Sequence, residues 1–213
     1  MKKLFVGCVL LGSLFVPAYR AQVPSAGMQN FDGCGLEGDA KPQPLKNLNR
    51  LKNRFTPPAA SQMNPQITLD AILAPGNDLN RWSESQGATV TGYVIDVKPG
   101  GPETVNCHAT DPRHVDTHIE LAVNPGDSQG IKHMIVEVTP RGRAIIASKG
   151  KDWSTVNLRR TMMGRKVTVT GWMMVDRQHC NASENTNPGN ANNWRATCWE
   201  IHPVTGLAPV SQP

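Results

Sequence analysis

Histidines and carboxylates occur together at two places in the sequence, and they are the residues with the clearest potential for chemistry. Imidazole nitrogens and carboxylate oxygens are ligands that suit Zn²⁺ or another divalent cation. Their spacing matches no established metal signature such as HExxH, and solvated residues on strand faces and in loops are the alternative interpretation. If a metal site exists, we expect His118, Glu120 and His202 to form it. The first group comprises His108, His114, Asp116, His118 and Glu120, and the second comprises Glu200 and His202.

A basic segment between residues 129 and 166 is the second candidate site, because nine lysines and arginines there face only two acidic residues. In a barrel, such a track beside an aromatic ring can hold single-stranded nucleic acid through phosphate contacts and base stacking. An exposed tryptophan can stack on a sugar in the same way. A solvated helix face is the alternative explanation for the arginines. The candidate ligand-binding residues are Tyr93, Lys132, Arg141, Arg143 and Trp194.

Recognised catalytic motifs are missing from the sequence. It contains no GxSxG nucleophile motif, no Walker phosphate-binding loop and no dinucleotide-binding glycine cluster. We therefore assign no catalytic residue and expect no cofactor other than a possible divalent metal. A metal-dependent hydrolase that uses the His/Glu cluster is the alternative to a binding protein.

Residues 1–21 have the pattern of a secretory signal peptide: Lys2 and Lys3, an apolar run, and small residues at Ala18 and Ala21. The run is too short to cross a bilayer and nothing comparable follows it, so we expect no transmembrane segment after cleavage. Cleavage removes three basic residues and no acidic ones, leaving 19 basic against 17 acidic. The predicted location is periplasmic or secreted.

Four cysteines remain after such cleavage, an even number that favours disulfides in an oxidising compartment. Three pairings are possible. Cys180 and Cys198 bracket one Asn-rich loop, so we favour a bridge between them, which leaves Cys34 with Cys107. The absence of a CxxC spacing argues against redox catalysis and against a zinc ribbon.

Residues 22–86 form a proline-rich, partly helical N-terminal extension. Leu45, Leu48, Leu51 and Phe55 follow one another at spacings of three and four, which predicts an amphipathic helix within 44–55. A second short helix is predicted over 68–74, with Thr68 as its cap. These helices would pack on a core that begins at residue 87.

The core is predicted to be mostly β, because apolar and polar residues alternate in five segments. The predicted strands are 88–98, 117–123, 132–140, 165–176 and 194–204, and a helix over 153–164 separates the third from the fourth. Glycines inside the first and fourth strands suit the coiling of a small barrel. An immunoglobulin-type sandwich, the main rival, would need about seven strands and no helix at this place.

This order of elements resembles the OB-fold, a five-stranded Greek-key barrel with a helix between strands three and four. The strings TVTGYVIDVKPGG, HIEL, IVEVTPR, VTVTGW and WEIHPVTG are similar to those of exported, uncharacterised bacterial OB-like proteins. The resemblance covers residues 87–207 and leaves 208–213 as a tail. It implies an exported binding module for a ligand such as single-stranded nucleic acid, an oligosaccharide or a protein. We expect the contact surface on the outer faces of the second and third strands and their adjoining loops.

Overall fold

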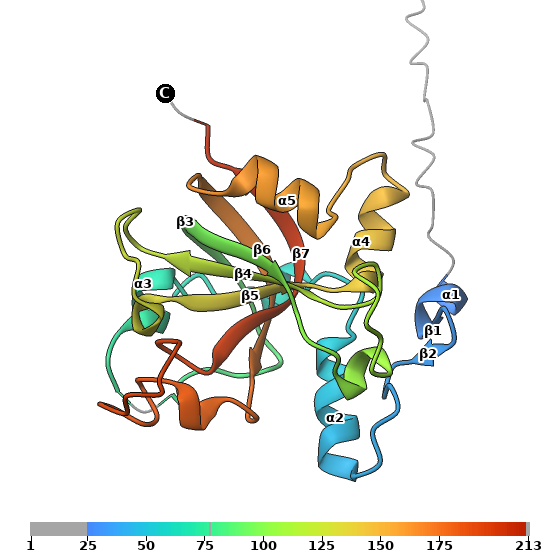
Figure 1. Cartoon of the computed structure of the whole chain (residues 1–213), viewed down its shortest axis with the longest axis horizontal. Helices are drawn as coiled ribbons and strands as arrows, with labels where there is room; N and C mark the ends of the chain where they lie inside the picture. The colour runs from blue at the N-terminus through green and yellow to red at the C-terminus, as the bar shows by residue number, and fades with distance from the viewer. Residues whose placement is uncertain (1–24, 77, 212–213) are drawn as a thin grey trace, which may run out of the picture.

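A closed five-stranded barrel forms the centre of the molecule (Figure 1). The computed structural model describes residues 25–76 and 78–211. The strands close in the order β3-β4-β5-β7-β6, and all neighbours are antiparallel except β5 and β7, which are parallel. The five strands are β3 (Gly87–Pro99), β4 (Thr117–Ala122), β5 (Met134–Val138), β6 (Lys166–Val175) and β7 (Trp199–Pro209).

Alternating aliphatic side chains fill the barrel. Successive side chains of a strand point to opposite faces, so every second residue lies inside. Val94, Ile119, Val136 and Ile201 are all buried in this core, each from a different strand. The residues between them, including His118, Glu137 and Glu200, therefore belong to the outer wall.

Gly171 in β6 lets two strands approach closely. A Cβ at this position would lie 2.3 Å from the carbonyl oxygen of Pro203 in β7. The register between β6 and β7 also shifts on both sides of Gly171. Only glycine fits here without a shift of the backbone.

Two helices lie between β5 and β6 where the sequence predicted one. The predicted helix over 153–164 is present as α5 (Thr155–Met162), which packs against β3. The other, α4 (Pro140–Ala147), was not predicted, because Pro140 was interpreted only as the end of a strand. Proline is also favoured in the first turn of a helix, and the Thr139 hydroxyl caps α4 by accepting a hydrogen bond from the Gly142 N–H at 3.1 Å.

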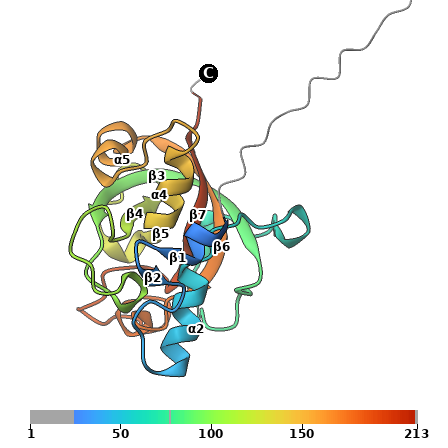
Figure 2. The same cartoon turned by 90° about the vertical axis from the view of Figure 1, so that its right-hand side faces the viewer.

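The N-terminal extension contains both helices expected from the sequence. Thr68 caps the second, its hydroxyl accepting from the Ala71 N–H at 3.2 Å. The first packs against β7, and Figure 2 shows it on this side of the barrel. Its elements are α1 (Ser25–Gln29), β1 (Asn30–Phe31), β2 (Cys34–Gly35), α2 (Gln43–Lys52), the 3₁₀ helix η1 (Ala60–Gln62) and α3 (Leu69–Leu73); further 3₁₀ turns are η2 (Thr104–Asn106), η3 (Gly130–Lys132) and η4 (Cys180–Ala182).

Disulfides join Cys34 to Cys107 and Cys180 to Cys198, as predicted. The first fastens the extension to the loop after β3, and the second closes the Asn-rich loop onto the start of β7. Such bridges indicate folding in an oxidising compartment. The predicted signal peptide, residues 1–21, lies outside the described residues. Within the described ranges, no helix combines the length and the apolar character that a membrane span requires.

Candidate metal centre

Strand register brings three of the polar outer-wall residues together. His118 on β4 lies opposite Glu137 on β5. The parallel pairing of β5 with β7 places Val136 beside Ile201, so Glu137 and His202, one residue further along each strand, are also neighbours. One carboxylate therefore stands between two imidazoles.

The extension buries this part of the wall. The exposed fractions are 3% for Asp116, 2% for Glu137 and 0% for His202. Lys52 at the end of α2 is 2% exposed. The Arg54 guanidinium donates to the carbonyl oxygen of His202 at 3.3 Å. The outer wall is therefore closed to solvent at these residues, while the contact surface expected on the outer faces of β4 and β5 stays a prediction.

Glu137 contacts both histidines. Its Oε1 lies 2.9 Å from His118 Nε2, and its Oε2 lies 3.4 Å from His202 Nδ1. Neither contact is aligned as a hydrogen bond. His202 Nδ1 does have a hydrogen-bond partner, Glu200 Oε2, at 3.3 Å. Glu200 thus fixes the orientation of the His202 ring.

Asp116 completes a compact group with Glu137 and His202. Each of the three offers one ligand atom, and these atoms all lie within 4.8 Å of one another. In the part of the chain that the structure describes, Asp116 Oδ1, Glu137 Oε2 and His202 Nε2 are buried without a hydrogen-bond partner. Buried polar atoms are rarely left in this condition, since each costs about 1–3 kcal/mol. Three of them in one cluster make these side chains candidate ligands for a cation.

The protonation of the cluster follows from burial and from its opposite charges. Burial opposes the charge on His118, but the Glu137 carboxylate outweighs it and raises the pKa of His118 to about 9. Burial opposes the charge on His202 as well, and Glu137 again raises the pKa of that imidazole. Burial favours a protonated Glu137, yet the two histidines hold its pKa far below the usual range. Burial raises the pKa of Asp116 to about 6, even though His202 attracts the carboxylate.

Further ion pairs extend from this cluster toward the surface. Glu200 pairs with the fully buried Arg195, and Arg195 also donates to Asp176 Oδ2 at 3.0 Å. Asp176 Oδ2 in turn lies 2.5 Å from Nδ1 of His179, and the His179 side chain is 43% exposed. Acidic and basic side chains therefore alternate from His202 through Glu200, Arg195 and Asp176 to His179.

The sequence-predicted metal ligands are separated into two groups. His118 and His202 meet at Glu137, whereas Glu120 pairs with Lys98 and lies 2.8 Å from His133 Nδ1. Glu120 is therefore not part of the Asp116–Glu137–His202 cluster. Asp116 and Glu137, which belong to the cluster, were not among the three residues predicted to form a metal site. Two features of the sequence could have indicated them. Asp116 lies two residues before His118, and Glu137 is the single carboxylate of the third predicted strand.

The predicted ligand-binding residues are also spread over different surroundings. Arg141 is 1% exposed and Arg143 is 9% exposed, so both belong to the interior. Lys132 pairs with Asp127 at 3.0 Å. Tyr93 lies under Lys166, and Trp194, 37% exposed, lies beside Arg195 and His179. A role of these residues in contacting a ligand remains a prediction.

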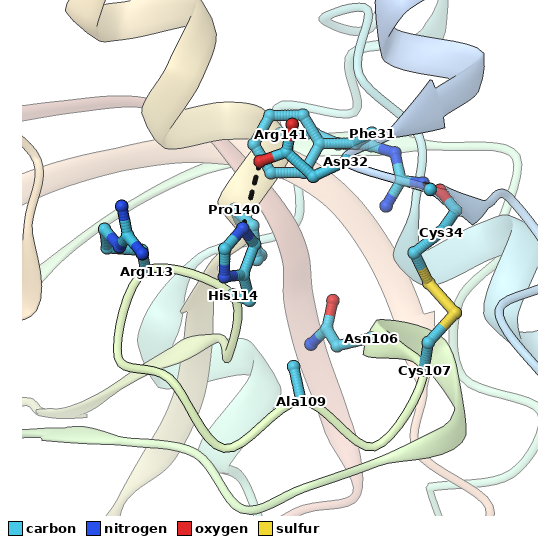
Figure 3. A pocket seen from close by; sticks show the side chains of 11 residues that line it. Phe31, Asp32, Cys34, Asn106, Cys107, Ala109, Arg113, His114, Pro140 and Arg141 are labelled. Atoms are coloured by element: carbon cyan, nitrogen blue, oxygen red, sulfur yellow. Dashed lines mark hydrogen bonds and ion pairs between the residues drawn. A yellow bond between two sulfur atoms is a disulfide. The ribbon is translucent and has the colours of Figure 1, made fainter.

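A pocket of about 560 Å³ adjoins the cluster (Figure 3). Asn106 lines this pocket and donates through Nδ2 to Asp116 Oδ2 at 2.9 Å, so one side chain separates the pocket from the candidate ligands. The opposite side carries Phe31, Asp32 and His114, and the Cys34–Cys107 disulfide closes one end.

Comparisons with known proteins returned no match to a protein-family model, to a curated protein or to a solved structure. The interpretation of the site therefore depends on its own geometry.

Proposed function

We propose that this chain is an exported OB-type binding protein, periplasmic or secreted, and that it binds a divalent cation of the zinc class. The ligands are Asp116, Glu137 and His202. The observation that carries the proposal is the meeting of three buried side chains, each of which offers one ligand atom within 4.8 Å of the others; each also has a buried atom without a hydrogen-bond partner. The strand order and the parallel pair of β5 and β7 support the OB-type assignment.

The donor set suits a zinc-class ion. Nitrogen and oxygen ligands bind zinc at about 2.0–2.2 Å, so tetrahedral ligands lie roughly 3.3–3.6 Å apart. From a separation of 4.8 Å, the ligand atoms therefore need to approach one another by about 1.2–1.5 Å at most. His202 binds through Nε2 while its Nδ1 faces Glu200, the arrangement in which a carboxylate orients a metal-bound imidazole. Asn106 holds Asp116 in the same way.

Metal binding at this site displaces protons. A histidine must be neutral to bind a metal, whereas Glu137 keeps the pKa values of His118 and His202 raised. In the metal-free protein, the two imidazolium ions neutralise the charge of Glu137. In the metal-bound protein, the cation neutralises it. It also supplies the counter-charge that the buried Asp116 lacks. Affinity therefore increases as the pH rises through the range in which the histidines deprotonate.

A metal-dependent hydrolase is the second candidate. Three protein ligands leave a fourth coordination position, as in catalytic zinc sites, and the pocket behind Asn106 lies next to it. A hydrolase requires turnover of a substrate, and this turnover must be lost on chelation and on substitution of His202. A binding protein requires no turnover.

The test is metal uptake by the full chain after treatment with a chelator and its removal. Isothermal titration with Zn²⁺ at pH 8 is expected to show one site in the wild type, and Glu137→Gln and His202→Gln are expected to lose at least tenfold in affinity. Glu120→Gln is the matched control, because Glu120 is on the same barrel wall but outside the cluster, and it should bind like the wild type.

Thermal unfolding gives a second readout, since a ligand at 100 times its Kd adds about 2.7 kcal/mol to the stability of the folded state. Absence of stoichiometric uptake by the wild type contradicts the proposal. An equal loss of affinity in Glu120→Gln and Glu137→Gln contradicts the ligand assignment.

A further inference from the structure

Arg141 carries a buried charge that no carboxylate neutralises by contact. Its guanidinium donates to three backbone carbonyl oxygens and one amide oxygen, all of them uncharged acceptors. Among the described residues, no carboxylate oxygen lies within 4.0 Å of it. The acceptors are Met28 O at 2.9 Å, Asn53 Oδ1 at 2.6 Å, Cys34 O at 2.6 Å and Gly35 O at 3.1 Å.

Arg143, two residues further along α4, also carries a buried charge that no carboxylate neutralises by contact. It donates to the hydroxyl of Thr117 at 2.8 Å and to carbonyl oxygens of the preceding loop, and no carboxylate of the described chain pairs with it. Burial lowers the pKa of both guanidinium groups, and Asp116 counteracts this only through space. A buried charge without a paired counter-ion is costly. The start of α4 is therefore a region that favours an incoming anion.

The 560 Å³ pocket opens beside this region (Figure 3). Arg141 lines it together with Arg113 and His114. Arg113 is ion-paired with Asp111 at 2.7 Å, and the acidic group on the wall, Asp32, lies 3.0 Å from His114. Arg141 uses four of its five N–H groups in the bonds described above, so one remains for a carboxylate or phosphate oxygen. The volume is in the range of sites for small organic molecules. Arg141, which no carboxylate of the described residues contacts, is thus the group that favours an anionic ligand.

An apolar hollow of about 370 Å³ continues from the pocket. The two share Phe31, Arg113 and Pro140, and the hollow is further lined by Ala144 and Trp153. A ligand that fills both spaces needs an anionic head and an apolar body. Phe31 lies at the boundary, where its ring can contact that body.

We propose that this pocket binds a small organic anion, with a carboxylate or phosphate head toward Arg141 and Arg113 and an apolar body over Phe31. The site is distinct from the Asp116–Glu137–His202 cluster, and Asn106 separates the two. It does not require a bound metal.

The experiment uses the full chain in the presence of a chelator, so that the outcome is independent of the metal proposal. Phenyl phosphate is titrated by calorimetry at low salt, with inorganic phosphate and benzyl alcohol as probes of the head and the body alone. We expect saturable binding of phenyl phosphate, weaker binding of inorganic phosphate and none of benzyl alcohol. Arg113→Gln should weaken binding about tenfold, the value of one charge-assisted hydrogen bond.

Arg160→Gln is the matched control, since Arg160 is exposed on α5 outside both cavities and should leave the affinity unchanged. Arg141 also fastens the extension, so Arg141→Met tests the charge only if its circular dichroism matches the wild type. Arg113→Gln and Phe31→Ala provide the test if it does not. Lack of saturable binding of phenyl phosphate overturns the proposal, as does an equal effect of Arg113→Gln and Arg160→Gln.

Discussion

Replacement of Glu137 by glutamine should destabilise the fold in a pH-dependent way. The substitution keeps the shape of the side chain and removes the charge that faces His118 and His202. In the wild type, burial disfavours the His118 imidazolium but Glu137 raises its pKa from 6.5 to about 9. Without the carboxylate, burial opposes the imidazolium and only Glu200 and Asp116 act against it, so the pKa of His118 falls.

The size of the effect follows from that pKa. A difference of 2.5 pH units between folded and unfolded chains corresponds to about 3 kcal/mol, at 1.36 kcal/mol per unit. Because the folded-state pKa is the higher one, this stabilisation is complete below pH 6.5 and is lost as the pH rises through 9. The raised pKa of His202 acts in the same direction. The wild type should therefore exceed Glu137→Gln by about 3 kcal/mol at pH 6, and the difference should narrow above pH 9.

The assay is denaturant unfolding of the full chain between pH 5.5 and 9.5, with disulfides intact and a chelator present. Asp70→Asn, at an exposed position in the first turn of α3, is the control and should follow the wild-type curve. If Glu137→Gln lost stability between pH 6.5 and 9 as steeply as the wild type, the assignment of Glu137 as the group that holds the His118 proton would be refuted.

Two further predictions concern the framework. Conversion of Cys34 and Cys107 to serine should cost about 4 kcal/mol, since the bridge closes a separation of 73 residues, and denaturant unfolding without reductant measures it. A stability unchanged within 1 kcal/mol would contradict this. Gly171→Ala should cost about 1–3 kcal/mol through its contact with the Pro203 carbonyl, whereas Gly126→Ala, at an open position, should be neutral in the same assay. Equal stability of the two variants would show that the barrel relaxes at β6.

Much of the barrel was predictable because each strand encodes its two faces in its own sequence. The alternation around Ile119 and Val136 marks inward residues whatever the neighbouring strand is. The beginning of the last strand was not predicted correctly. Residues 194–198 were predicted as strand, but β7 begins at Trp199. Asp78 of the extension accepts hydrogen bonds from the Thr197 hydroxyl at 2.6 Å and the Cys198 N–H at 3.0 Å, and this distant contact holds the segment as a loop.

The candidate site was predictable only in part. The sequence identified His118 and His202, but it selected Glu120 as the third candidate ligand. Glu120 and Glu137 are both outer-wall carboxylates on neighbouring strands, so periodicity cannot distinguish them. The register does: Glu137 lies opposite His118, while Glu120 lies opposite Ile135.

The sequence by itself determined most of the strand segments, the Thr68 cap, the cysteine set and the residue types available for a metal, because all of these are local properties. The tertiary structure alone decided which strands are neighbours and which surface the extension covers. Those features arise from contacts between residues far apart in the chain, such as Arg54 with the His202 carbonyl. The physical consequence is a change of environment: side chains that would be solvated on an open strand face become a buried, charged cluster with unpartnered atoms.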